Sequence, residues 1–175
     1  MLTAACGDDG EAPIVMEDAG DPASACPPTT PAFSTGAMGL SVTDPELNLK
    51  VRVDAASHQP PRFGTNDWTI AITDMNGQPL PQAQLTWACA FMPAHGHGSN
   101  PRVVEKLDPT LWRLERQNMS MQGLWEIQLW IDPDGGSKDF TGGQGGINSM
   151  ACTGPQNALP TLVLPACVPR RTDAS

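Results

Sequence analysis

The clearest pattern in the chain lies at residues 125–131, where the sequence reads Trp-Glu-Ile-Gln-Leu-Trp-Ile. Large apolar side chains at Trp125, Ile127, Leu129 and Ile131 therefore share one parity. An alternation of period two is typical of a strand that turns one face toward a core. The stretch predicts a β-strand that packs against a second sheet.

Stretches upstream show the same alternation and are separated by turn signals. Their apolar positions are Leu47, Leu49, Val51 and Val53, then Trp68, Ile70 and Ile72, then Leu85, Trp87, Cys89 and Phe91, with shorter signals at Val103, Val104, Trp112 and Leu114. Asn76-Gly77 predicts a turn, because both residues accept a positive φ. About six or seven such strands predict an all-β fold, a sandwich of two antiparallel sheets.

Composition narrows the class of protein. The chain has 175 residues and a formal net charge of −9, which would repel a polyanion, so we expect no nucleic-acid partner. Its 17 Gly and 18 Pro argue against long helices, because Gly is costly inside a helix and Pro removes a backbone donor. No run of 18 apolar residues occurs that could cross a membrane as a helix.

The length suits one domain with tails. Residues 1–6 are interpreted as the remnant of an export signal and residues 7–37 as a disordered tether, because the latter have few large apolar groups. The sandwich is predicted at residues 38–132. Residues 133–175 are interpreted as a glycine-rich connector and a C-terminal arm, with a short edge strand at residues 159–164.

The first residues resemble the end of a bacterial lipoprotein signal. Small residues, Ala4 and Ala5, precede Cys6, as they do at sites of cleavage and lipidation. A full signal also needs a basic start and an apolar stretch, so we expect translation to begin upstream of Met1. This assigns a lipid anchor to Cys6 and the protein to the cell envelope, on the periplasmic or outer-membrane side. An ordinary N-terminus with a chance Ala-Ala-Cys is the alternative.

Five cysteines are an awkward number in an oxidising compartment, but assigning Cys6 to lipid leaves four. The remaining Cys26, Cys89, Cys152 and Cys167 predict two disulfides. Three pairings are possible, and we favour a bond from Cys89 to the C-terminal arm, because strand parity turns Cys89 toward the core. Zinc ligation is the alternative, although no pair has the Cys-x-x-Cys spacing of structural zinc sites.

The stretch 91–98 reads Phe-Met-Pro-Ala-His-Gly-His-Gly and is the most distinctive in the chain. His95 and His97 are separated by one residue and can project to the same side of an extended segment, and Met92 lies three residues before His95. Thioether sulfur suits Cu(I), and imidazole accepts Cu(I), Cu(II) or zinc. The stretch predicts a copper site. A glycine-rich turn whose histidines only hydrogen-bond to the backbone is the alternative.

Two further methionines, Met119 and Met121, share the parity of Trp125. This parity turns both sulfurs inward, near an end of the sandwich where loops converge. Core packing explains the pattern equally well, because methionine fills irregular gaps. We expect both histidines and one thioether to bind a single copper ion, if the fold brings the two segments together. The candidate ligands are Met92, His95, His97, Met119 and Met121.

Several motifs occur in an order that resembles the YtkA-like domain, related to FixH-type proteins. They are Gly64-Thr65-Asn66, Asp74-Met75-Asn76-Gly77-Gln78-Pro79-Leu80, Met92-Pro93-Ala94-His95-Gly96-His97-Gly98 and Met121-Gln122-Gly123-Leu124-Trp125. The likeness covers about residues 51–132. It implies an immunoglobulin-like sandwich on the outer side of the cytoplasmic membrane, and some relatives are associated with copper handling. The chain departs from many relatives at Ala94, where they have a second Met.

Catalysis finds little support, because the sequence has no nucleophile elbow and no His-Glu-x-x-His stretch. We therefore expect a protein that is not an enzyme. The expected function is a copper carrier or chaperone of the cell envelope, whose partner is an envelope protein or a copper-receiving protein and whose membrane contact is the lipid anchor. The alternative is a non-metal interaction module whose loops or exposed Trp130 contact another envelope protein.

Overall fold

The structure is a computed structural model, and it describes residues 26–27, 30–99, 101, 103–136, 152 and 160–169. Cys6 and residues 7–25 of the predicted tether lie outside these ranges. The regular elements described are η2 (Gly36–Met38), β1 (Ser41–Asp44), β2 (Leu49–Ala56), β3 (Gly64–Thr73), β4 (Gln84–Met92), β5 (His97–Ser99), β6 (Val103–Lys106), β7 (Leu111–Met119), β8 (Gly123–Asp132) and β9 (Leu162–Val168). No helix in this part of the chain is long and apolar enough to cross a membrane.

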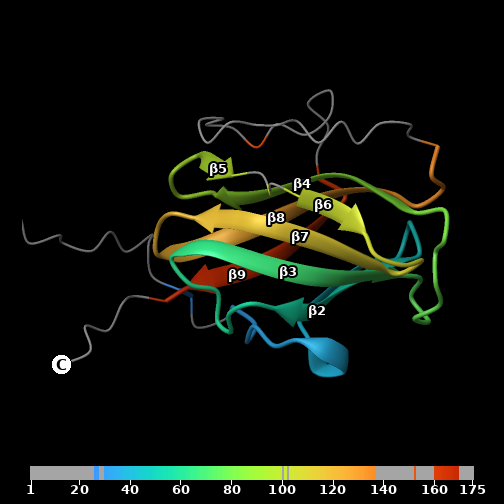
Figure 1. Cartoon of the computed structure of the whole chain (residues 1–175), viewed down its shortest axis with the longest axis horizontal. Helices are drawn as coiled ribbons and strands as arrows, with labels where there is room; N and C mark the ends of the chain where they lie inside the picture. Colours follow the sequence, from blue (N-terminus) through green and yellow to red (C-terminus); the bar gives the residue numbers. More distant parts are fainter. Residues whose placement is uncertain are drawn as a thin grey trace, which may run out of the picture.

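The strands form two antiparallel sheets that pack as a β-sandwich (Figure 1). One sheet has the strand order β1-β2-β3-β7-β6, and the other has the order β5-β4-β8-β9. The sheet order β2-β3-β7-β6 corresponds to the ABED sheet of an immunoglobulin-like domain, and the order β4-β8-β9 corresponds to its CFG sheet. The predicted all-β sandwich is confirmed, with nine strands in the described residues instead of six or seven.

Alternating side chains of both sheets meet in one apolar core. Val51, Val53, Ile70 and Ile72 come from the five-stranded sheet, and all four are at most 1% exposed. They face the side chains of β8 whose alternation in the sequence predicts a buried face. These are Trp125, Ile127, Leu129 and Ile131. The period-two pattern therefore identifies the buried faces of β2, β3 and β8 correctly.

The inward face of β4 differs from the prediction. Its core residues are Leu85, Ala88, Ala90 and Met92. Trp87, Cys89 and Phe91, which share the parity of Leu85, lie on the outer face instead. The pairing register with β8 shifts between Leu85 and Trp87, and such a bulge inserts a residue that reverses the side chains beyond it. The core orientation expected for Cys89 is therefore wrong.

The sandwich extends past the predicted boundary at residue 132. β9 pairs with β8 from Gly123–Val168 to Leu129–Leu162. The edge strand expected at residues 159–164 is therefore present, but it runs from residue 162 to residue 168. Its side chains in the core are Leu162, Leu164, Ala166 and Val168. Because β9 fills the place of the last strand of the fold, it is part of the domain and not an appended arm.

Two disulfides attach cysteines outside the strands, Cys26 and Cys152, to the four-stranded sheet. Cys26 is bonded to Cys167 in β9, with Cα atoms 5.6 Å apart, and Cys89 in β4 is bonded to Cys152, with Cα atoms 5.8 Å apart. The two predicted bonds and the favoured link from Cys89 to the C-terminal segment are confirmed. Because all four cysteines are paired, none is available as a thiolate ligand for zinc.

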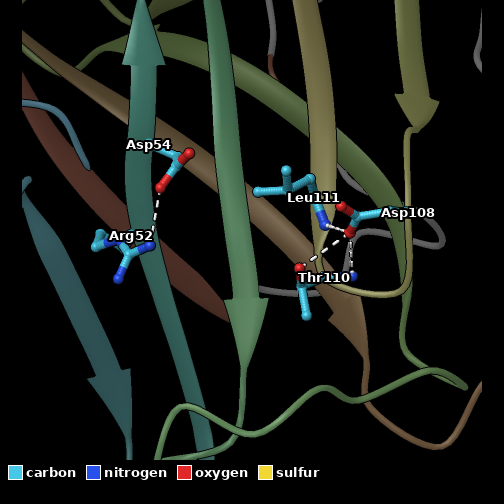
Figure 2. Close-up of polar contacts among 5 residues, drawn as sticks. All are labelled: Arg52, Asp54, Asp108, Thr110 and Leu111. Atoms are coloured by element: carbon cyan, nitrogen blue, oxygen red, sulfur yellow. Dashed lines mark hydrogen bonds and ion pairs between the residues drawn. The ribbon is translucent and has the colours of Figure 1, made fainter. Parts of the chain in front are cut away.

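The outer face of the five-stranded sheet is polar. Arg52 and Asp54 alternate along β2 and form an ion pair of 2.8 Å (Figure 2). Arg113 of β7 lies between Glu105 and Glu115 and pairs with both. These side chains are about one third to one half exposed, and ion pairs of this kind contribute little to stability. We interpret this face as a solvated surface.

Candidate metal centre

The β4–β5 turn and the β7–β8 connection lie at the same end of the sandwich (Figure 1). The turn is tight, because the carbonyl of Met92 accepts hydrogen bonds from the backbone N–H groups of His95 and Gly96, at 3.1 and 3.0 Å. Gly96 has a φ of 65°, in the left-handed region that glycine adopts without a steric cost. The chain thereby reverses between the two histidines, and His97 pairs with Met92 across the ladder.

β5 turns the side chain of His97 toward the interior. Side chains alternate between the two faces of a strand, so His97 and Ser99 share one face. The Ser99 hydroxyl donates to the carbonyl of Asn118 in β7, at 2.8 Å, which fixes this face toward the opposite sheet. The partly buried His97 ring lies edge-on to Trp125, with ring centroids 6.1 Å apart.

Met121 meets His97 at this end. It lies in the β7–β8 connection, and its carbonyl accepts a hydrogen bond from the indole N–H of Trp125, at 3.0 Å. The Met121 Sδ atom lies 3.3 Å from Nε2 of His97. The ring of His95, which is exposed, has its centroid 5.8 Å from that of His97. Two imidazoles and one thioether therefore gather at one place.

The separation of the two donor atoms fits a shared metal ion. Bonds of about 2.0 Å to nitrogen and about 2.3 Å to sulfur, at a tetrahedral angle of about 109°, place the donors about 3.5 Å apart. The distance of 3.3 Å between Nε2 of His97 and Sδ of Met121 is close to this separation. The same distance suits a hydrogen bond to sulfur, which requires a proton on Nε2. A metal requires Nε2 without that proton.

The donor set favours a soft metal. Among the described residues, no group of three or more His, Cys, Asp or Glu side chains is placed to hold a metal ion. A metal bound here would therefore take thioether sulfur together with imidazole. Copper accepts both kinds of ligand, whereas calcium and magnesium prefer carboxylate oxygens. The residues present fit copper better than they fit a hard cation.

The other two candidate methionines lie deeper. Met92 and Met119 are both 0% exposed and belong to the core cluster. The inward orientation predicted for Met119 is found, but Met119 and Met121 do not lie on one strand, because β7 ends at Met119 and the connection then crosses to the other sheet. The thioether that touches an imidazole is that of Met121.

Trp130, which the interaction-module alternative names together with the loops as a possible contact, is not exposed. It lies on the outer face of β8, opposite Trp87 of β4, and is only 4% exposed. The third histidine, His58, lies in the β2–β3 loop with its Nδ1 atom 2.9 Å from the hydroxyl of Ser57.

Sequence reasoning missed two residues that shape this site. Trp125 is predicted as a core residue, but nothing in the period-two pattern indicates that its ring packs against an imidazole. Ser99 follows the His-Gly-His stretch without any signal of its own, because its hydrogen bond joins the two sheets and no local pattern reports such a contact. The Met-Gln-Gly-Leu-Trp order of residues 121–125 is the one local signal that links Trp125 to Met121.

Comparison with known proteins adds no relative. No family model, curated protein or solved structure matches this chain.

Proposed function

We propose that this protein binds copper through His95, His97 and Met121 and acts as a carrier or chaperone. The observation that carries the proposal is the distance of 3.3 Å between Nε2 of His97 and Sδ of Met121, beside a second imidazole. Mixed imidazole and thioether ligation tolerates both Cu(I) and Cu(II). A site of this kind suits a protein that receives an ion and surrenders it without turning over a substrate.

The placement of the ligands favours transfer over permanent retention. His95 is exposed on the β4–β5 turn, whereas His97 and Met121 are partly buried. An incoming ligand from a copper-receiving protein would reach the ion from the side of His95 and displace that imidazole first. The two inner ligands would then hold the ion until the transfer is complete.

The same proposal places the protein in the cell envelope. Two disulfides are in keeping with an oxidising compartment, and the Ala-Ala-Cys sequence at residues 4–6 is in keeping with a lipid anchor on Cys6. The motif order that resembles the YtkA-like domain supports the same location. The partner would be a copper-receiving protein of that compartment.

A competition titration tests the proposal. Purified protein is titrated with Cu(I) and with Cu(II) against a chromophoric chelator, alongside His95→Ala/His97→Ala. The double variant should lose at least about 100-fold in affinity, which corresponds to about 2.7 kcal/mol. His58→Ala, which removes the imidazole outside the cluster, should bind as the wild type does. Equal affinity in the wild type and the double variant, or binding by neither, would discard the proposal.

The choice of thioether is tested in the same titration. Met121→Leu should weaken Cu(I) binding by at least about ten-fold, or about 1.4 kcal/mol, and should weaken Cu(II) binding less, because thioether sulfur is a soft ligand. Met119→Leu is the matched control, since it replaces a fully buried methionine by a side chain of similar volume. A loss in Met119→Leu without a loss in Met121→Leu would assign the sulfur ligand to the deeper methionine.

A further inference from the structure

The Cys89–Cys152 disulfide lies directly behind the strand that carries His97. A side chain at Gly98 would collide with Sγ of Cys152 and approach Sγ of Cys89 to 3.1 Å. Both sulfurs also lie against the carbonyl oxygen of Ala90, at 3.7 and 3.6 Å. The disulfide therefore packs on the outer side of β5, at the residue that follows His97.

β5 has few other attachments. It has three residues and lies at the edge of its sheet, where β4 is its one pairing partner among the described strands. Short edge elements with few contacts open locally at little free-energy cost. On the inner side of β5, the described contacts are the Ser99 hydrogen bond and the contacts of His97 with Met121 and Trp125. Between these contacts and the disulfide, β5 is held from both sides.

We infer that the Cys89–Cys152 disulfide is a positioning group for the copper site, so that the affinity of the site depends on this bond being intact. The inference rests on the proposed copper function and adds a means of regulating it. The disulfide lies against Gly98 on the outer side of β5, and it thereby limits movement of the adjacent His97 away from Met121. Loss of the bond frees the outer side of β5 and lets the imidazole move away from the thioether.

Gly98 has a definite role in this arrangement. Any Cβ at residue 98 would overlap Sγ of Cys152 and would come within 2.5 Å of the carbonyl oxygen of Ala90, so glycine is needed where β5 lies against the disulfide and β4. Within the His-Gly-His-Gly stretch, Gly96 thus serves the turn and Gly98 serves the contact with the disulfide. Gly96 allows the turn that precedes His97, and Gly98 allows the disulfide to lie close behind it.

The test compares the two disulfides. Cys89→Ala/Cys152→Ala removes the bond behind β5, and Cys26→Ala/Cys167→Ala removes the bond at the opposite edge of the same sheet. The first variant should bind copper about 10-fold or more weakly than the wild type, the loss typical of groups that orient metal ligands. The second should keep wild-type affinity. Equal affinity in the two variants would overturn the inference.

A double-mutant cycle separates positioning from general destabilisation. If the disulfide acts through His97, its removal should cause no further loss of copper affinity in a His97→Ala background, so the two effects are strongly non-additive. A disulfide that merely stabilises the domain would cause the same loss in both backgrounds. Additive losses would therefore contradict the inference.

Hydrogen exchange in the metal-free protein separates this inference from the proposed function. Loss of the Cys89–Cys152 bond should speed the exchange of the amides at residues 97–99 and leave those of β8 unchanged. If the wild type binds no copper, the proposed function fails, and the exchange rates still decide whether the disulfide holds β5. Unchanged exchange at residues 97–99 would show that the disulfide does not hold β5 and would overturn the inference.

A second variant covers the case in which the disulfide variant does not fold. Gly98→Ala keeps both disulfides and places a methyl group against Sγ of Cys152 and the carbonyl oxygen of Ala90. It should displace β5 and reduce copper affinity, whereas Gly77→Ala, in a turn with no atom within 4 Å of the added Cβ, should not. Wild-type affinity in Gly98→Ala would count against the inference.

Discussion

Two buried amides face each other across β3 and β7, and they differ in how they are satisfied. Asn66 and Gln117 are register partners, and both are 0% exposed. Asn66 donates to the carbonyls of Arg62 and Gly64, at 2.8 and 3.0 Å, and accepts from the N–H of Arg62, at 3.0 Å. Neither amide atom of Gln117 has a hydrogen-bond partner in the described part of the chain. Asn66 therefore anchors the β2–β3 loop, whereas the side-chain amide of Gln117 is buried without a hydrogen bond to compensate for its desolvation.

Because of this difference, replacing each of the two amides by leucine should have opposite effects on the free energy of unfolding. Gln117→Leu should raise the free energy of unfolding by about 1–2 kcal/mol, because it removes an unsatisfied buried amide. Asn66→Leu should lower it by at least as much, since the loop at residues 62–64 loses its partners. Urea unfolding followed by tryptophan fluorescence measures both. A Gln117→Leu variant less stable than the wild type would mean that the amide has a partner.

At the level of elements, the sequence is most informative where strands are regular. β8 has an unbroken alternation, so its buried face could be predicted from residues 125–131. β4 has an equally apolar sequence, but the bulge beyond Leu85 depends on pairing with β8 and has no local signal. β1 was missed because Val42 is its single large apolar residue, and β5 was missed because it begins and ends within a glycine-rich stretch.

The candidate site could be predicted in part. The residue types of the His-Gly-His stretch and of residues 119–121 indicate possible metal ligands, because the softness of a ligand atom depends on the type of side chain that carries it. Which methionine meets His97 depends on where the β7–β8 connection crosses between the sheets. That crossing follows the end of β7 at Met119, and no periodicity in the sequence predicts it.

The turn between β6 and β7 is organised by one carboxylate. Asp108 Oδ1 accepts from the backbone N–H groups of Thr110 and Leu111, each at 2.7 Å, and from the Thr110 hydroxyl at 2.9 Å (Figure 2). The backbone hydrogen bond from Thr110, followed by that from Leu111, lowers the pKa of Asp108 below its ordinary value. The charged form is therefore favoured in the folded protein.

A pH-dependent contribution to stability follows from this lowered pKa. The stabilisation is fully present above the ordinary aspartate value of about 3.9 and is lost as pH falls through the lower folded-state value. Asp108→Asn should therefore unfold at a lower urea concentration than the wild type at pH 7, and the difference should shrink in acid below that value. Thr110→Val, which removes only the hydroxyl, should have a smaller effect. A difference that stays constant over this range would contradict the assignment.

On the scale of the whole molecule, the chain is tied together from its two ends. Cys26 and Cys167 are 141 residues apart in sequence, and their bond fixes the segment before the sandwich to its last strand. Residues 133–161 separate β8 from β9 in sequence, yet β9 lies directly beside β8. The four-stranded sheet is therefore complete only when β9, which is far from β8 in sequence, has paired with it.

The dependence on β9 gives the last prediction. Leu164 is 0% exposed in the core, whereas its neighbour Val163 points outward and is partly buried. Leu164→Ala should lower the free energy of unfolding by about 2–5 kcal/mol, as expected for a large buried aliphatic side chain, and Val163→Ala should lower it by less than about 1 kcal/mol. Urea unfolding with both disulfides intact measures the two. If the sandwich ended near residue 132, both substitutions would be nearly silent, so a negligible effect of Leu164→Ala would exclude β9 from the folded unit. A large effect confined to Leu164 would instead mean that the core of this protein is completed by its last strand.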